Sequence, residues 1–94
     1  MKVVYHELAL VDLEETAAFL QQRSPAGARN VLRAIHAAIG EIAANPEIAR
    51  RTSDPTVRLK VVSRYGYKIF YSPTDEAVEI LHVRHGARRA WFVE

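Results

Sequence analysis

The chain has 94 residues, of which 49% are hydrophobic, and it carries no cysteine. Length and composition predict one globular domain over residues 1–94 and exclude a disordered chain, disulfide bonds and thiolate metal sites. No apolar run approaches the ~18 residues of a membrane span, and the first residues lack the apolar segment of a signal peptide. We therefore expect a cytoplasmic protein with no membrane partner.

The formal net charge of +2 is unevenly distributed along the chain. Residues 1–49 carry four Lys/Arg and six Asp/Glu, for a net charge of −2. Residues 50–94 carry nine Lys/Arg and five Asp/Glu, for a net charge of +4. A basic half is typical of a protein that binds a nucleic acid or an acidic protein segment, although a solvated basic surface gives the same count.

A short β-type run at residues 2–6 is followed by two predicted helices. The first helix spans residues 7–22, and its apolar residues at helical spacing are Leu8, Leu13, Ala17 and Leu20. The second helix spans residues 25–44 and has one apolar stripe. Ser24 is a good N-cap, Pro25 suits the first helical position, and Asn45-Pro46 ends the helix. The one-residue joint predicts an antiparallel helical hairpin.

Residues 47–55 are predicted to form a loop, and from Thr56 onwards the apolar period changes to two, which is typical of strands. Three runs, 57–62, 67–71 and 78–85, are separated by short turn signals, so we expect an antiparallel meander. The last run is apolar on both faces, which is typical of a central strand. The order β-α-α-β-β-β predicts an α+β fold in which an antiparallel sheet packs against the helical hairpin, followed by a short C-terminal tail.

Basic side chains recur along the predicted strands. Arg58 and Lys60 share one face of a strand, about 6.5–7 Å apart, which is similar to the spacing of successive phosphates. Lys68 on the next strand and Arg64 at the turn can extend this patch. Repeated positive charge on a rigid support suits phosphate recognition, but the solvent face of a hairpin gives the same pattern.

Polar groups also gather at the end of the last strand, where His82, Arg84 and His85 precede Gly86. A histidine can act as a general base and an arginine can stabilise developing negative charge. The two histidines fall on opposite faces of a strand, so we expect no metal site. Gly66 and Gly86 are isolated and do not form a phosphate-binding loop, so we expect no cofactor.

The chain resembles the RelE/ParE superfamily of toxins from type II toxin–antitoxin modules over nearly its whole length. The resemblance rests on the order of the elements and on six segments: residues 9–13, 24–28, 45–46, 57–60, 66–71 and 80–89. It implies one of two activities. RelE-like members are ribosome-dependent endonucleases that cut mRNA without a metal, whereas ParE-like members bind and poison DNA gyrase and are not enzymes.

Each activity implies its own set of residues. The catalytic candidates of a nuclease are Arg58, Lys60, Lys68, Arg84 and His85. The candidates for target binding are Arg58, Lys60, Arg64, Arg84, His85, Arg88, Arg89 and Trp91.

Two positions depart from the nuclease branch, which tends to have an arginine around Gly86 and a tyrosine near Phe92. The ending His85-Gly86-Ala87-Arg88-Arg89 is similar to that of ParE-like members. The favoured function is therefore gyrase inhibition, the alternative is the mRNA endonuclease, and a further alternative is an inactive toxin-fold binding module. The resemblance also implies a hetero-oligomer with a cognate antitoxin that has an acidic C-terminal segment.

Overall fold

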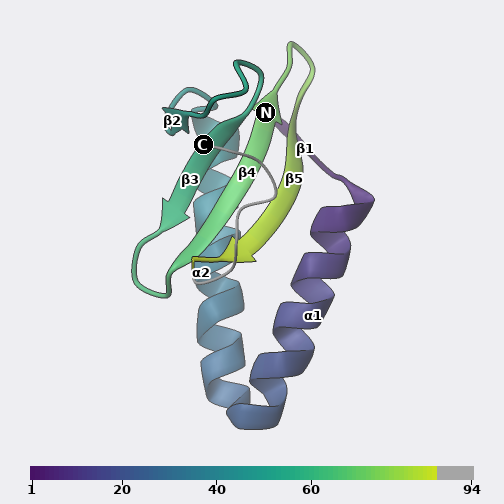
Figure 1. Cartoon of the computed structure of the whole chain (residues 1–94), viewed down its shortest axis with the longest axis vertical. Helices are drawn as coiled ribbons and strands as arrows, with labels where there is room; N and C mark the ends of the chain where they lie inside the picture. The colour runs from purple at the N-terminus through teal and green to yellow at the C-terminus, as the bar shows by residue number, and fades with distance from the viewer. Residues whose placement is uncertain (87–94) are drawn as a thin grey trace.

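The computed structural model of the protein describes residues 1–86, so Arg88, Arg89, Trp91, Phe92 and the expected tail lie outside the described residues. The elements are β1 (Lys2–Tyr5), α1 (Glu7–Arg23), α2 (Pro25–Ala44), β2 (Arg50–Arg51), β3 (Arg58–Val62), β4 (Tyr67–Pro73) and β5 (Ala77–His85). The two helices pack against one five-stranded sheet (Figure 1). The predicted α+β fold is therefore confirmed. No helix among residues 1–86 has the length and apolar content needed to cross a bilayer.

The strand order is β1-β5-β4-β3-β2. Strands β3, β4 and β5 form the predicted antiparallel meander, and β2 extends it by pairing antiparallel with β3. The sheet as a whole is mixed, because β1 pairs with β5 in the parallel direction, from Lys2 opposite Ala77 to Tyr5 opposite Ile80. Strand β5 therefore lies inside the sheet, as its two apolar faces predicted. Strand β2 replaces part of the predicted loop, and its two residues are too few to show a strand period in the sequence.

Helix α2 has the boundaries that its sequence predicts, because its start signal, its apolar stripe and its stop signal all indicate the same helix. The Ser24 hydroxyl oxygen accepts a hydrogen bond from the Gly27 N–H at 3.0 Å, and Pro25 occupies the first helical position. The Asn45 N–H donates to the carbonyl of Glu41 at 3.0 Å and closes the last turn. The buried stripe consists of Ala28, Val31, Ile35, Ala38, Ile39 and Ile42.

Helix α1 buries only some of its apolar residues. Its buried residues are Ala9 and Asp12, and Leu13 and Leu20 are partly buried against the core. Leu8, which belongs to the apolar set at helical spacing, is exposed. Apolar residues occur all around this helix, so periodicity alone does not identify its inner face.

Both faces of the sheet carry apolar residues. The main core lies between the sheet and the helices, where Ile35, Ile42, Ile69 and Ile80 pack in one cluster. A smaller cluster contains Val57, Leu59 and Phe70, with Leu81 packed against it. These residues alternate with the helix-facing ones along β3 and β4, so they lie on the face directed away from the helices. We call this second face the outer face.

Strand β5 contains a β-bulge that changes its register with β4. His82 lies opposite Phe70 and Ile80 lies opposite Tyr71, so Leu81 has no counterpart on β4. The pairing with β1 also ends at Ile80. One edge of β5 pairs with β4. Beyond the bulge, α1 packs along the other edge of β5, where no strand pairs with it (Figure 1).

Candidate functional site

Arg58 and Lys60 lie on the helix-facing side of β3. They stand opposite Tyr71 and Ile69, two residues that pack in the main core. The Arg58 guanidinium donates to the carbonyl of Ala49 at 2.8 Å and forms an ion pair with Glu47. The Lys60 ammonium lies 3.4 Å from the Glu41 carboxylate on α2. Only 15% of the Arg58 side chain and 22% of the Lys60 side chain are exposed.

The prediction of one continuous basic patch is therefore wrong. Lys68 lies opposite Val61 on β3 and opposite Arg84 on β5, and it is displaced by one residue from Ile69. Since successive side chains of a strand point to opposite faces, Lys68 lies on the outer face and Arg58 and Lys60 lie on the other. The spacing of Arg58 and Lys60 predicted that they share a face of the strand, but it did not predict which face of the sheet the helices cover.

Arg58 belongs to a group of contacts that holds the segment after α2 against the sheet. The neighbouring Tyr71 hydroxyl donates to the carbonyl of Pro46 at 2.8 Å. Burial raises the pKa of Tyr71, which favours the neutral, donating hydroxyl. Arg58 and Tyr71 thus bond two carbonyls of one loop, at Ala49 and Pro46. This geometry gives Arg58 a structural role.

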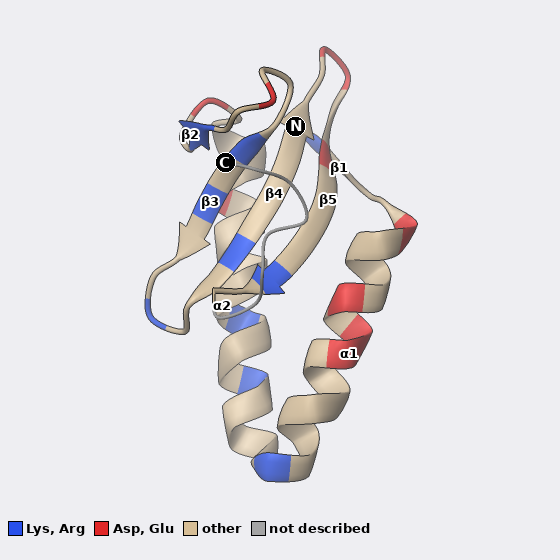
Figure 2. Ribbon diagram, viewed as in Figure 1, with Lys and Arg blue, Asp and Glu red and all other residues tan. Residues whose placement is uncertain are grey.

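Lys68 and Arg84 form the main cationic feature of the outer face. They are direct cross-strand neighbours, and Figure 2 shows basic positions side by side near one end of β4 and β5. The Nε atom of Arg84 is buried and has no hydrogen-bond partner among residues 1–86. Arg64 is exposed in the turn Ser63–Gly66, before β4, with its guanidinium carbon 5.7 Å from the Tyr65 ring centroid. We call Lys68 and Arg84 the Lys68–Arg84 pair.

Two glycines meet next to this pair. Gly66 has a φ of 75°, a conformation that other residues rarely adopt. The Gly86 N–H donates to the Gly66 carbonyl at 2.5 Å. A Cβ atom added at Gly86 would lie only 2.8 Å from that oxygen. A side chain at position 86 therefore requires the turn to move, so glycine suits this position.

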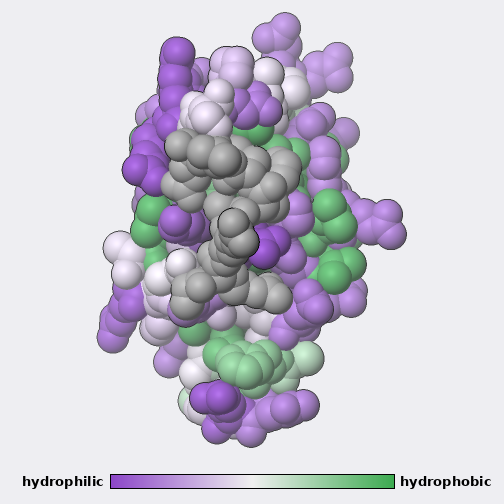
Figure 3. All heavy atoms as spheres, in the orientation of Figure 1, coloured by the Kyte–Doolittle hydropathy of each residue, from purple (hydrophilic) through white to green (hydrophobic). Residues whose placement is uncertain are grey.

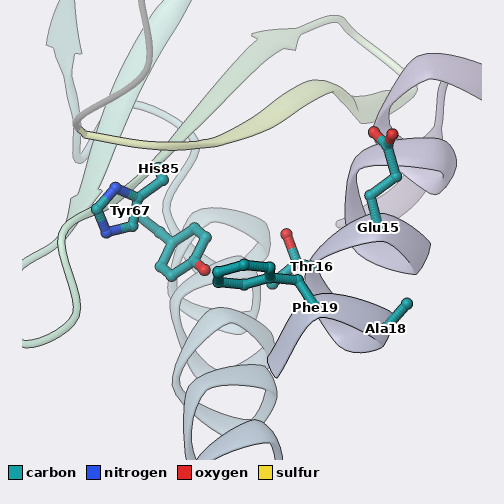
Figure 4. A pocket seen from close by; sticks show the side chains of 6 residues that line it. All are labelled: Glu15, Thr16, Ala18, Phe19, Tyr67 and His85. Carbon is teal, nitrogen blue, oxygen red and sulfur yellow. The ribbon is translucent and has the colours of Figure 1, made fainter. Parts of the chain in front are cut away.

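A cavity opens between α1 and the ends of β4 and β5. Its volume is about 650 Å³, and it is lined by Glu15, Thr16, Ala18, Phe19, Tyr67 and His85. His85 packs edge-on against Tyr67, with ring centroids 5.0 Å apart. The Phe19 and Tyr67 side chains point toward each other in Figure 4. The sequence interpretation placed His85 in the site but missed the contribution of α1.

A second arrangement that the sequence interpretation missed joins α1 to the bulge of β5. The Asp12 carboxylate accepts hydrogen bonds from the Val83 N–H at 2.9 Å and from Nδ1 of His82 at 2.8 Å. Both Asp12 and His82 are buried. Because the two side chains are 70 residues apart, no local motif marks the contact. The available signal was an acid at position 12 on the same helical face as the buried Ala9.

The positions of these side chains determine what the site can bind and which chemistry it can support. Within residues 1–86, no group of three or more His, Asp or Glu side chains gathers as metal ligands would. His82 is bonded to Asp12, whereas His85, beside Tyr67, lines the cavity. The Lys68–Arg84 pair can bind a phosphate or a carboxylate through charge and hydrogen bonds.

Comparisons with known proteins give a family and a fold. The family model described as "ParE toxin of type II toxin-antitoxin system, parDE" matches residues 3–90. A similar solved structure is the chromosomal ParDE system from P. aeruginosa, with a TM-score of 0.78, 18% identity, and coverage of 90% of this chain and 95% of that chain.

A second similar structure is the isolated E. coli RelE toxin, with a TM-score of 0.67, 16% identity, and coverage of 94% of this chain and 86% of that chain. At these identities the two structures show a shared fold. No curated protein sequence gives a significant match. The family match over nearly the whole chain shows that the protein belongs to the ParE toxins of type II toxin–antitoxin systems, a membership that implies a cognate antitoxin.

Proposed function

We propose that the protein inhibits DNA gyrase in the cytoplasm without catalysing a reaction, and that its cognate antitoxin neutralises it. The observation that carries this proposal is the dispersal of the groups that a nuclease would need. Arg58 and Lys60 are engaged on the helix-facing side, while Lys68 lies on the outer face. Gly86 has no side chain, and its contact with Gly66 prevents a simple replacement. The match to the ParE family supports the same choice.

Inhibition by binding requires a complementary surface instead of a reacting group. The outer face offers the Lys68–Arg84 pair, and Arg64 is exposed in the turn at the same end of β4. His85 lies at this end on the helix-facing side, opposite Tyr67. Such a surface suits an acidic region of gyrase or the DNA that gyrase holds. Arg88, Arg89 and Trp91 follow directly in the sequence and remain predictions, since they lie outside the described residues.

The test is a gyrase assay with purified toxin. We expect loss of supercoiling and accumulation of cleaved DNA with the natural protein. Both effects should weaken when Lys68 and Arg84 are changed together to Ala. The matched control is Arg33→Ala, which removes an exposed charge from α2 and should leave inhibition unchanged. Normal supercoiling and cleavage at micromolar toxin would contradict the proposal.

The alternative function, a ribosome-dependent mRNA endonuclease, is favoured by one observation. His85 follows Arg84 directly on β5, so an imidazole lies at the same end of the strand as the Lys68–Arg84 pair, on the opposite face of the sheet. Primer extension on translated mRNA should then show cuts that disappear in the Lys68→Ala, Arg84→Ala double variant. The absence of cuts with active ribosomes excludes this function. Expression without growth arrest would instead favour the inactive binding module.

A further inference from the structure

The joint end of the helical hairpin contains no acidic residue. Residues 16–40, which form the second half of α1, the joint and most of α2, contain three Arg and no Asp or Glu. Figure 2 shows basic positions on α2 and at the joint, and acidic positions on the part of α1 that is farther from the joint. The surface at this end is hydrophilic in Figure 3. The net charge of −2 for residues 1–49 therefore conceals a positive pole at the end of the hairpin.

Basic side chains line one side of α2. Arg29, Arg33 and His36 are separated by four and three residues, so they share one side of the helix, and all three are exposed. This side is directed away from the buried stripe through which α2 packs on the core. The three residues extend for about 10 Å along the helix. We call them the α2 basic row.

The arginines of the α2 basic row are available to a ligand. Within residues 1–86, neither Arg29 nor Arg33 takes part in an ion pair. Glu41 is the only acid in the sequence of α2, and its carboxylate lies 3.4 Å from the Lys60 ammonium on β3. Neighbouring carboxylates of the described residues therefore do not neutralise the two guanidinium groups.

The chemistry of this surface suits the phosphate backbone of double-stranded DNA. Arg29 and Arg33 are roughly 6 Å apart along the helix axis, similar to the spacing of successive phosphates. A guanidinium can bind a phosphate through two parallel hydrogen bonds. Ala37 and Gly40 continue the exposed side with little or no side chain, so a DNA backbone can approach the helix closely. Since α2 has no Phe, Tyr or Trp on which unpaired bases could stack, the surface favours a duplex over a single strand.

We propose that the α2 basic row binds the phosphate backbone of double-stranded DNA without reading its sequence. The row lies on the helix layer, whereas the Lys68–Arg84 pair lies on the outer face of the sheet. The toxin thus carries two cationic surfaces on different layers of the fold. DNA that is bound at α2 leaves the outer face open to the target, so this binding is separate from gyrase inhibition.

The test measures binding of the purified toxin to a fluorescent DNA duplex of mixed sequence by anisotropy. Changing Arg29 and Arg33 together to Gln removes two phosphate contacts and retains good helix formers. The affinity should fall roughly 10-fold at about 50 mM salt, and the slope of log affinity against log salt should become shallower by about 2. Because both residues are exposed, thermal unfolding of this variant should match that of the natural protein.

A matched control separates the α2 basic row from net charge. Lys2→Gln combined with Arg51→Gln removes the same number of charges from exposed positions on β1 and β2. This variant should bind the duplex within about 3-fold of the natural protein, because salt screens distant charges. An equal loss of affinity in the two double variants would show a response to net charge alone and overturn the proposal. The absence of duplex binding by the natural protein would overturn it as well.

Two further measurements distinguish other modes of binding. If Lys68→Ala with Arg84→Ala abolished duplex binding while Arg29→Gln with Arg33→Gln retained it, the DNA would lie on the outer face, contrary to the proposal. Tighter binding of a single-stranded RNA of the same length would show a different nucleic acid partner and also contradict it. These measurements contain no gyrase, so a failure of gyrase inhibition leaves them intact. Loss of duplex binding by the α2 variant with unchanged inhibition of supercoiling would support two separate surfaces.

Discussion

The two helices of the hairpin use their apolar residues in opposite ways. Helix α2 places Val31, Ile35 and Ile42 in the core as part of a stripe along one side. Helix α1 buries few residues fully, while Leu8 and Phe19 remain exposed. The difference teaches that apolar content alone does not identify a core helix. In α2 it stabilises the fold, whereas in α1 part of it is available to a partner.

The two helices also differ in the contacts that attach them to the rest of the fold. The first turn of α2 is capped by the Ser24 hydroxyl, whereas His6, at the start of α1, makes no side-chain capping hydrogen bond. Helix α1 is instead attached to β5 by the buried carboxylate of Asp12. We infer that the stability of α2 depends on apolar packing and a cap, and that the placement of α1 depends strongly on one polar contact.

The largest expected effect contrasts apolar truncation in the two helices. Ile42→Ala should reduce the free energy of unfolding by about 2–5 kcal/mol, because Ile42 is fully buried and its removal leaves a cavity. Val11→Ala should change it by less than ~0.5 kcal/mol, because Val11 is exposed. Urea denaturation of both variants measures the difference. Equal losses would show that α1 contributes to the core as α2 does.

The next effect concerns the contact between α1 and the bulge. Asp12→Ala should reduce the free energy of unfolding by about 1–3 kcal/mol, because the buried Val83 N–H and His82 ring lose their acceptor. Glu14→Ala removes an exposed acid from the same helix and serves as the control. Chemical denaturation gives both values, and a loss no greater than that of Glu14→Ala would show that the contact does not hold α1.

A smaller effect is expected at the helix starts. Ser24→Ala should reduce the free energy of unfolding by about 1 kcal/mol, because the Gly27 N–H loses its acceptor. His6→Ala should have less effect, since the contact of its side chain with Glu79 is exposed to solvent. Thermal unfolding of the two variants ranks them. The reverse ranking would contradict the inferred difference between the two caps.

The smallest effect should be stabilising. Gly40 lies on the exposed side of α2, and a Cβ atom added there would meet no atom of residues 1–86 within 4 Å outside its own stretch of helix. Gly40→Ala should therefore raise the free energy of unfolding by roughly 0.4–1 kcal/mol through helix propensity and a less flexible unfolded chain. Gly86→Ala, in which the new Cβ meets the Gly66 carbonyl, should be destabilising. A loss of stability in Gly40→Ala would show that this side of α2 is less open than its surroundings indicate.

The fold could be predicted from the sequence where several local signals agree. The boundaries of α2 are correct because the N-cap, the proline, the apolar stripe and the stop at Asn45 all indicate the same helix. The orientation of α1 could not be predicted, because the apolar residues of this helix occur on all of its sides. The parallel pairing of β1 with β5 also could not be predicted, since it joins segments separated by most of the chain.

The candidate site was less predictable than the fold, for a specific physical reason. Strand alternation shows that Arg58 and Lys60 share a face, but Leu59 and Val62 make both faces of β3 apolar. The helices could therefore cover either face. Asp12, Phe19 and Tyr67 acquire their roles from contacts between distant segments, which local periodicity does not report.

The contact between Gly86 and Gly66 has a consequence for how such a chain could change its activity. An arginine at position 86 requires the turn to shift, because its first side-chain carbon would lie only 2.8 Å from the backbone oxygen of Gly66. The turn would have to be remodelled first, and that change by itself brings no new chemistry. A change in the turn and an arginine at position 86 should therefore have strongly non-additive effects on stability, because the two sites are in direct contact. A single substitution would not be enough to place an arginine at this position of the toxin.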